Sequence, residues 1–244
     1  MAEVSNSSTT DSAVYRNRRE QIAHYFDNTA MEHWRRLTSD VKVSRVRQSV
    51  RAGRETMQQQ LLAWLPDDLR GQRVLDAGCG TGVLAAQLAA RGASVVGIDL
   101  SPQLIAIARE QRPAQFGDDR LLYLSGDMLD PSVGEFDYIV AMDSLIHYAL
   151  PETMQAVAEL TERCHRGLCF TFVPRTPLLA IMHATGQLFP SDNRSPDVTP
   201  TPPVKVRQAI AATLGTDSWR LADEARVDSF FYKSHALRLE RTGS

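Results

Sequence analysis

The chain has 244 residues, 43% of them apolar, and a formal net charge of −2, which suits one large domain or one domain with an added cap. This net charge is too small to imply a nucleic-acid partner, and the sequence has no dense basic stripe of the kind that duplex binding requires. Cys79, Cys164 and Cys169 have the spacing of neither a disulfide framework nor a metal site. We therefore expect a cytoplasmic protein in a reducing compartment, without a protein-bound metal.

The amino-terminal part of the chain precedes the first predicted strand. Residues 1–12 are polar, lack the apolar run of a signal peptide and are expected to form a disordered tail. Residues 13–64 have a helical pattern and are expected to form an arm or cap. Within them, residues 16–54 hold ten Lys or Arg against four Asp or Glu. This excess is either a solvated helical face or an electrostatic guide toward an anionic substrate or membrane surface.

From residue 72, short apolar runs alternate with helical periods, which is typical of a mostly parallel sheet with helices on both faces. Five strands are expected at 73–78, 94–99, 121–126, 136–142 and 167–173. Two further strands, at 219–227 and 231–240, are expected to form an antiparallel hairpin. Among the helices between strands, one should end at Gly92 and two should begin near Ser101 and Pro151, because glycine, N-cap serine and first-turn proline mark helix ends.

A long connection at 174–203 follows the fifth strand. It ends in "PSDNRSPDVTPTPP", where five prolines in 14 residues resist regular structure. Because ligands of open α/β folds bind at the carboxyl edge of the sheet, from which this connection departs, we favour a flexible lid over a plain linker. Its apolar part, residues 176–189, is shorter than the roughly 20 residues of a membrane span, so only peripheral contact with a membrane is expected.

The run "VLDAGCGTG" places Gly78, Gly80 and Gly82 at the turn from the first strand into a helix. Glycines there allow a ligand to approach the backbone closely, and Asp99 ends the second strand, where a carboxylate can accept both ribose hydroxyls. A nicotinamide dinucleotide would require a small residue at position 83, which is valine. Asp76 would repel a pyrophosphate but can face an ammonium and a sulfonium, so the motif favours a cofactor with a cationic amino-acid end.

Through "LDAGCGTG", "GIDLS" and "SGDMLD", residues 75–240 resemble the class I S-adenosylmethionine-dependent methyltransferases. The resemblance implies a Rossmann-like α/β fold over 65–244, with seven strands and the last one antiparallel. It also implies S-adenosylmethionine as cofactor and S-adenosylhomocysteine as product, with Asp127 accepting the exocyclic amine of the adenine. The cofactor-binding residues that it implies are Asp76, Gly78, Cys79, Gly80, Asp99, Leu100, Ser101, Gly126, Asp127, Met128, Met142, Asp143 and Trp34.

The acceptor is indicated by "HYFDNTAMEHWRRL" at 24–37 together with "MDSLIHY" and "FTFVPRTPLLAIMHATGQLFP". These segments resemble the magnesium protoporphyrin IX O-methyltransferases of bacteriochlorophyll and chlorophyll synthesis. The resemblance implies methyl transfer to one propionate of magnesium protoporphyrin IX, giving the monomethyl ester. It also implies that the arm and the insertion after the fifth strand are flexible covers, and that magnesium chelatase, through its large subunit, hands over the substrate.

A porphyrin is a flat apolar disc with two carboxylates, so it requires an apolar cover and cations at one edge. The apolar residues offered are Leu178, Leu179, Ile181, Met182, Leu188 and Phe189, and the candidate cations are Arg35, Arg36 and Arg175. Two alternatives remain open: a quinone or phenol O- or C-methyltransferase, whose acceptor needs a base because a phenol has a pKa of about 10, and a catalytically silent cofactor-binding scaffold.

The resemblance assigns catalysis to His147 and Tyr25. An ionised propionate has no proton to lose, and methyl transfer to it is an in-line displacement in which alignment dominates. We therefore expect these two side chains to hold and orient the propionate. The alternative for His147 is a packed residue at the start of a helix.

Overall fold

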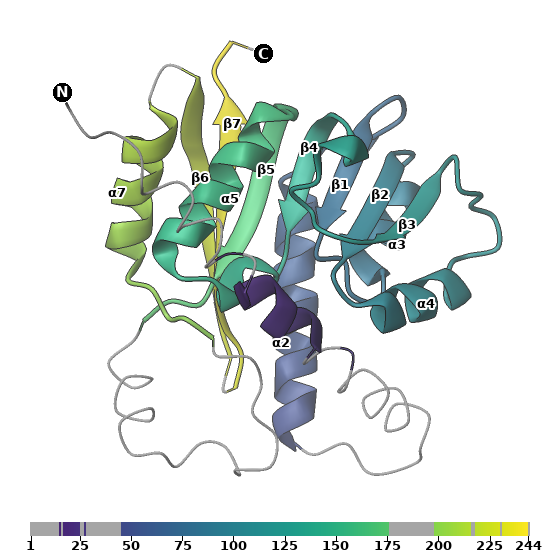
Figure 1. Ribbon diagram of the computed structural model, residues 1–244, viewed down its shortest axis with the longest axis horizontal. Coiled ribbons are helices and arrows are strands. Elements are labelled where there is room, and N and C mark those ends of the chain that lie inside the picture. Colours follow the sequence, from purple (N-terminus) through teal and green to yellow (C-terminus); the bar gives the residue numbers. More distant parts are fainter. Residues whose placement is uncertain are drawn as a thin grey trace.

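The computed structural model describes residues 15, 17–24, 27, 45–175, 198–215, 218–229 and 231–243. Their strands form one seven-stranded sheet in the order β3-β2-β1-β4-β5-β7-β6 (Figure 1). The strands are β1 (Arg73–Ala77), β2 (Ser94–Asp99), β3 (Leu121–Ser125), β4 (Phe136–Ala141), β5 (Cys164–Phe172), β6 (Trp219–Asp228) and β7 (Lys233–Arg241).

Strands β1 to β5 pair in parallel, and β7 runs antiparallel to both β5 and β6. The parallel part follows from the alternation of strands and helices, since a crossover returns the chain to the same edge before each new strand. The seven expected strands and the antiparallel last strand are thus confirmed. Edge strand β6 is rich in charge, and its Arg220 pairs with Glu240 of β7, as suits a strand exposed on one side.

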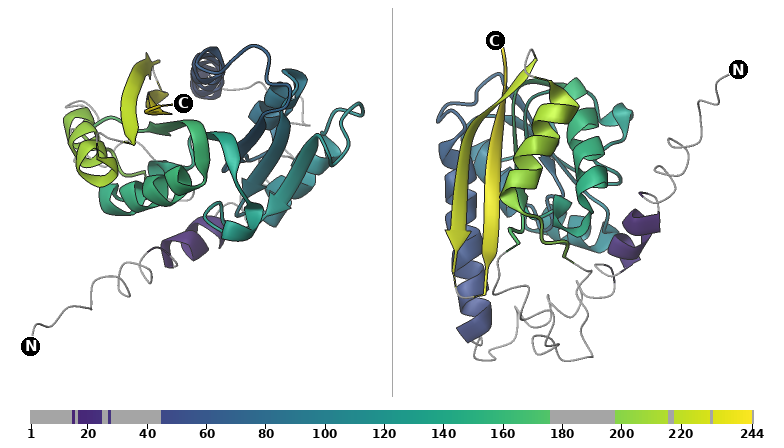
Figure 2. Two further views of the ribbon diagram at one scale, coloured as in Figure 1. Left: turned by 90° about the horizontal axis from the view of Figure 1, so that it is seen from above. Right: turned by 90° about the vertical axis from the view of Figure 1, so that its left-hand side faces the viewer.

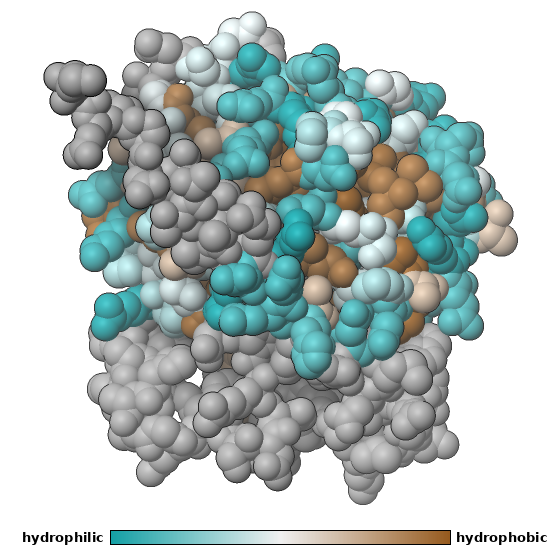
Figure 3. Space-filling model, in the orientation of Figure 1, coloured by the Kyte–Doolittle hydropathy of each residue, from teal (hydrophilic) through white to brown (hydrophobic). Residues whose placement is uncertain are grey.

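Helices cover both faces of this sheet. They are α2 (Arg45–Ala63), α3 (Val83–Ala90), α4 (Pro102–Glu110), α5 (Leu150–Glu162) and α7 (Pro203–Leu214). One apolar cluster packs α2, α3 and α4 on one face, and a second packs α5, α7 and the helical residues near position 22 on the other. Figure 2 shows α2 on the opposite side of the sheet from α5 and α7. On the face seen in Figure 3, hydrophobic residues gather in patches between hydrophilic ones.

The predicted helix ends are confirmed. Ser101 is the N-cap of α4, accepting a hydrogen bond from the Leu104 N–H at 3.2 Å, and Pro151 lies in the first turn of α5. Gly92 follows α3 with a φ of 98°. Helix α7 was not predicted, although its buried Val206 and Ile210 have the i, i+4 spacing of a helical face.

The carboxyl ends of the parallel strands meet at one edge, and several segments converge there. Figure 1 shows α2 extending past this edge, and Figure 2 shows helical residues 17–24 on the other side of the sheet from α2. The described ends of the 174–203 connection are pinned at the same edge, because Thr201 N–H donates to Val173 O at 2.9 Å and Thr199 N–H to Ile146 O at 3.0 Å. Within the described ranges, no helix combines the length and apolarity needed to span a membrane.

Candidate active site

The turn after β1 keeps its backbone open to a ligand. Gly78, Gly80 and Gly82 have φ values of 82°, 55° and 80°, in the left-handed region that disfavours other residues. A Cβ at Gly78 would overlap the side chain of Ser144, and one at Gly82 would overlap the ring of Tyr123. A Cβ at Gly80 would meet no atom within 4 Å. The turn is therefore tightly packed at its two ends and open in its middle.

Asp99 braces this turn from the end of β2. Its Oδ2 accepts the Gly80 N–H at 2.9 Å, and its Oδ1 accepts the Ser101 N–H at 3.0 Å. Burial raises the pKa of Asp99, while these two N–H groups oppose the rise. Leu100, the next residue, packs against the core. The carboxylate is thus held at the carboxyl edge, with lone pairs remaining for further donors.

Asp76 is a carboxyl group in a buried position at the end of β1. Only 2% of the residue is exposed, and among the described residues its Oδ2 has no hydrogen-bond partner. Burial is the main cause that raises the pKa of Asp76 to about 7, and the nearby charge of Asp99 adds to it. A buried acceptor without a donor is costly, so this oxygen fits a cationic ligand. The neighbouring Cys79 thiol stays protonated, because burial raises its pKa well above the usual value.

The loop after β3 contains the three residues expected to frame an adenine. The Gly126 N–H donates to Asp99 O at 2.9 Å, and Met128 is buried. Both oxygens of Asp127 already have partners from the amino-terminal helix: Oδ1 accepts from the Tyr15 hydroxyl at 3.0 Å, and Oδ2 from Arg19 Nη1 at 2.9 Å. The expected contact of Asp127 with adenine stays a prediction, and the arm approaches this carboxylate directly.

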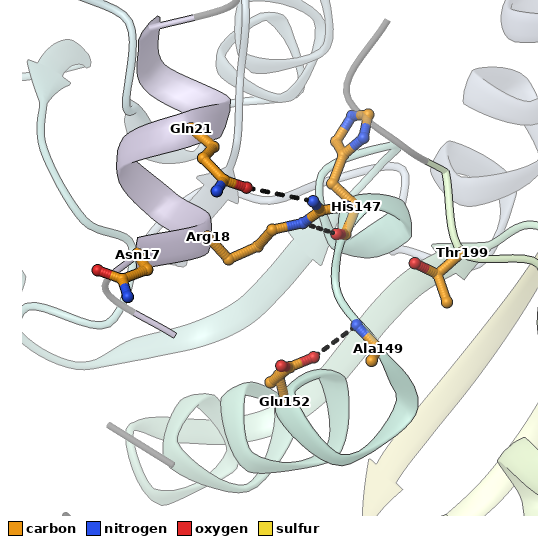
Figure 4. Close-up of a pocket in the computed structure, with 7 residues that line it drawn as sticks. All are labelled: Asn17, Arg18, Gln21, His147, Ala149, Glu152 and Thr199. Carbon is orange, nitrogen blue, oxygen red and sulfur yellow. Dashed lines mark hydrogen bonds between the residues drawn. The ribbon is translucent and has the colours of Figure 1, made fainter. Parts of the chain in front are cut away.

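His147 ends a short 3-10 turn, Leu145–His147, just before α5. The residue is 5% exposed, and its carbonyl accepts a hydrogen bond from Arg18 Nε at 2.7 Å. Figure 4 shows the imidazole directed away from Glu152 and its backbone directed toward Arg18. A cavity of about 320 Å³ opens here between the arm and the sheet edge, and its lining residues are Asn17, Arg18, Gln21, His147, Ala149, Glu152 and Thr199.

The amino-terminal helix touches this edge at two further points. The Tyr15 ring stacks on Tyr148, with centroids 5.3 Å apart, and the Asp27 carboxylate accepts from Ser101 Oγ at 2.7 Å. The described part of the arm therefore contacts the loops after β2, β3 and β4. Each of those loops contains residues that the sequence assigns to the cofactor.

At the tip of β4, Met142 is partly buried against the core and Asp143 is held by side chains from three other elements. Its carboxylate accepts the Tyr232 hydroxyl at 3.0 and 3.1 Å, contacts Arg54 Nε at 3.2 Å, and accepts from Thr171 Oγ1 at 3.3 Å. Arg54 comes from α2, Thr171 from β5, and Tyr232 from the turn between β6 and β7. Contact of Met142 and Asp143 with a cofactor stays a prediction.

Several expected site residues lie outside the described residues: Tyr25, Trp34, Arg35, Arg36 and the apolar residues of the proposed lid, 178–189. Arg175 is described, and its N–H donates to Thr201 O at 3.1 Å.

Four side chains at the site were not predicted from the sequence: Tyr15, Arg19, Arg54 and Tyr232. The excess of basic residues over 16–54 was a signal for the two arginines, without saying which carboxylates they would meet. The two tyrosines had no local signal.

Two family models match this chain. Residues 74–167 match the model of a methyltransferase domain, and residues 141–241 match the model described as magnesium-protoporphyrin IX methyltransferase C-terminus. The chain is 50% identical over 192 residues to a magnesium-protoporphyrin O-methyltransferase of Rhodobacter capsulatus, a match covering 78% of this chain and 84% of the relative.

The chain is also similar to a solved structure and, over part of its length, to a quinone methyltransferase. The crystal structure of magnesium protoporphyrin IX methyltransferase from Synechocystis PCC 6803 with bound SAH superposes with a TM-score of 0.77 at 27% identity, covering 92% of this chain and all of that one. A ubiquinone biosynthesis O-methyltransferase of Pseudomonas aeruginosa is 35% identical over 99 residues, which is 40% of each chain. Similarity to the quinone enzyme is thus confined to a part of the chain.

Proposed function

The chain belongs to the magnesium-protoporphyrin O-methyltransferase family, and we propose that its carboxyl-edge site brings the sulfonium of S-adenosylmethionine against a propionate of the porphyrin. It is an S-adenosylmethionine-dependent methyltransferase of chlorophyll or bacteriochlorophyll synthesis, and its acceptor is magnesium protoporphyrin IX. One observation carries the cofactor assignment: a buried carboxylate oxygen on Asp76, beside an open glycine turn, has no hydrogen-bond partner among the described residues.

Each side chain on the cofactor side has a distinct part in this proposal. When bound, S-adenosylmethionine supplies an electrophilic methyl group. Asp76 attracts the cationic amino-acid end, and Asp99, already oriented by Gly80 and Ser101, accepts the ribose hydroxyls. Asp127 is proposed to accept the adenine amine once Tyr15 and Arg19 release one of its oxygens, because both are in use in the structure. Gly78 and Gly80 admit the ligand close to the backbone.

On the acceptor side, the propionate carries its own negative charge and needs no base. His147 and Tyr25 are proposed to hold it in line with the sulfonium methyl, a role in which a small misplacement costs much of the rate. The amino-terminal arm covers the site, which the contacts of Tyr15, Arg18 and Asp27 with the loops of the sheet edge support. Delivery of substrate by the magnesium chelatase large subunit, a cytoplasmic location and peripheral membrane contact belong to the same proposal.

The direct test is to incubate the protein with magnesium protoporphyrin IX and S-adenosylmethionine and to follow the porphyrin by absorbance and mass spectrometry. The expected product is heavier than the substrate by one methylene unit, and saponification of the new ester returns it to the mass of the substrate. A demethyl quinol is offered in parallel as the competing acceptor. Methylation of the quinol without methylation of the porphyrin would contradict the assignment.

We expect His147→Ala and Tyr25→Phe to lower turnover at least about tenfold while leaving S-adenosylmethionine affinity nearly unchanged, because both act on the alignment of the acceptor. His147→Gln tests whether a hydrogen-bonding side chain rescues the rate. His165→Ala is the matched control, since His165 is an exposed histidine that pairs with Glu135 at 3.1 Å. Turnover is measured at saturating cofactor, and affinity by calorimetry.

The pH dependence adds a readout of mechanism. If His147 orients and does not remove a proton, the pH profile of turnover at saturating cofactor lacks a base limb near the unperturbed histidine pKa of about 6.5. Near-normal turnover in both His147→Ala and Tyr25→Phe would refute the role proposed for these residues, and a base limb that disappears in His147→Ala would favour proton removal instead.

A further inference from the structure

Asp143 adopts a backbone conformation that needs an explanation. Among the residues that the structure describes, it is the one non-glycine with a positive φ, at 55°. The left-handed region costs about 1–2 kcal/mol for an L-residue and persists where surrounding contacts hold it. Here the Asp143 N–H donates to Thr171 Oγ1 at 2.8 Å, and the carboxylate meets Tyr232, Thr171 and Arg54.

Helix α2 places Arg54 beside Asp143. The preceding residue, Gly53, packs so closely on the hairpin turn that a Cβ would lie 2.7 Å from Tyr232 Cβ and 2.8 Å from Ser229 Oγ. On the next turn, Met57 is fully buried. The contact of α2 with the hairpin therefore sets where the Arg54 guanidinium lies, and Asp143 holds it through Nε at 3.2 Å.

The position of Arg54 relative to the cofactor turn follows through the chain. Residue 144, next to Asp143, packs on Gly78, where an added Cβ would overlap it. Two consecutive residues, Asp143 and Ser144, thus connect Arg54 to the turn that admits the cofactor. Its side chain is 59% exposed while that of Asp143 is 15% exposed. A guanidinium has five N–H donors in a planar fork, so a contact through Nε leaves donors for a second carboxylate.

We propose that Arg54 binds the propionate of the magnesium porphyrin that is not methylated, and so sets the orientation of the disc over the methyl donor. This inference rests on the function proposed above. Two carboxylates enter the site with the substrate, and only one can point at the sulfonium. The reacting carboxylate gains nothing as a nucleophile from an arginine partner, which would withdraw its charge. The second carboxylate approaches the negative Asp143 and requires a cation.

Arginine suits this role because its fork pairs with a carboxylate through two N–H groups. The Tyr232 hydroxyl stays neutral, since burial and the charge of Asp143 raise the pKa of Tyr232 well above its usual range. Asp143 and Tyr232 therefore position the guanidinium, and Arg54 makes the contact with substrate. The same helix offers a control, because Arg51 is 78% exposed and pairs with Glu55 one turn away at 2.9 Å.

The experiment compares wild type, Arg54→Gln, Arg54→Lys and Arg51→Gln on three acceptors. These are magnesium protoporphyrin IX and its two monoamides, in each of which one propionate has become a neutral carboxamide. The monoamide that still accepts a methyl group retains the reacting carboxylate and lacks the other. KM and kcat are measured for each acceptor, with S-adenosylhomocysteine affinity and the unfolding midpoint as checks on cofactor site and fold.

With magnesium protoporphyrin IX, Arg54→Gln is expected to raise KM about tenfold or more, because a charge-assisted contact is lost, and to change kcat little. Arg54→Lys should fall between it and wild type, and Arg51→Gln should match wild type. With the reactive monoamide, wild type should already show the raised KM, and Arg54→Gln should add nothing to it.

An equal KM for wild type and Arg54→Gln on magnesium protoporphyrin IX would overturn the inference, and so would an equal loss on the dicarboxylate and the reactive monoamide. If Arg54→Gln does not fold, the same comparison is made with Arg54→Lys, whose loss on the dicarboxylate must likewise vanish on the monoamide. Failure of wild type to methylate any of the three acceptors would instead count against the proposed function.

Discussion

Replacing Asp76 by asparagine is expected to weaken S-adenosylmethionine binding by more than tenfold and at the same time to stabilise the folded protein above neutral pH. The two effects have one cause. The carboxyl group is buried without a hydrogen-bond partner for Oδ2 among the described residues, so its charge is costly until a cationic ligand arrives. Asparagine removes that charge, and with it the attraction for the ligand.

The sign of the pH effect follows from the direction of the pKa shift. The folded protein holds the Asp76 proton up to about pH 7, whereas an unperturbed aspartic acid has a pKa of 3.8. The free energy of unfolding therefore falls as pH rises from about 4 to 7, by up to about 4 kcal/mol from this group. In Asp76→Asn this fall should be absent, and chemical denaturation at pH 5 and pH 8 measures the difference. A variant no more stable than wild type at pH 8 would contradict the prediction.

Cofactor affinity should show the opposite trend with pH. Only the ionised Asp76 attracts a cation, so wild-type affinity is expected to rise between about pH 5.5 and 7.5, and calorimetry can follow the rise. Burial also raises the pKa of Asp99, so a smaller rise should remain in Asp76→Asn. Asp68→Asn is the control: Asp68 is an exposed carboxylate bound to Arg70 at 2.6 Å, and its replacement should leave cofactor affinity unchanged. An equally steep rise in Asp76→Asn would exclude Asp76 as the titrating group.

Gly78→Ala is expected to lower the free energy of unfolding by about 3 kcal/mol and to abolish measurable cofactor binding. An alanine at a φ of 82° is strained, and its Cβ would overlap the side chain of Ser144, so backbone strain and overpacking add. Denaturant unfolding and calorimetry measure the two losses. The overlap displaces the loop after β4, which moves the acceptor side together with the cofactor turn.

Two further variants separate these causes. Gly71 also has a positive φ, 77°, but a Cβ there would meet no atom within 4 Å, so Gly71→Ala should cost only the strain, about 1–2 kcal/mol. The double variant Gly78→Ala with Ser144→Gly also removes the Ser144 side chain that the new Cβ would overlap. It should therefore recover part of the lost stability. If Gly78→Ala is no more destabilising than Gly71→Ala, the packing of Ser144 on the turn is not tight.

The local features of the fold could be read from the sequence because each depends on neighbours along the chain. The strand before "GCGTG", the Ser101 cap and the proline in the first turn of α5 all agree with the structure. Helix α7 shows the limit of this reading. Its one proline, Pro203, ends a proline-rich run that predicts irregular structure. It nevertheless lies in the first turn of α7, and Gly215 follows the end of the helix, both common helix boundaries.

The cofactor class could be predicted from the sequence, because three glycines and two acidic residues at strand ends lie within 24 positions, Asp76 to Asp99. Which side chains meet the predicted site residues depends on the fold of the whole chain. Tyr15 reaches Asp127 from 112 positions away, and Tyr232 reaches Asp143 from 89. Such contacts depend on strand order and on how α2 and the β6–β7 hairpin pack, and hydrophobic periodicity carries no information about either. Arg54 is therefore one of ten basic residues within 16–54 in the sequence, and in the fold it is the partner of an aspartate with a positive φ.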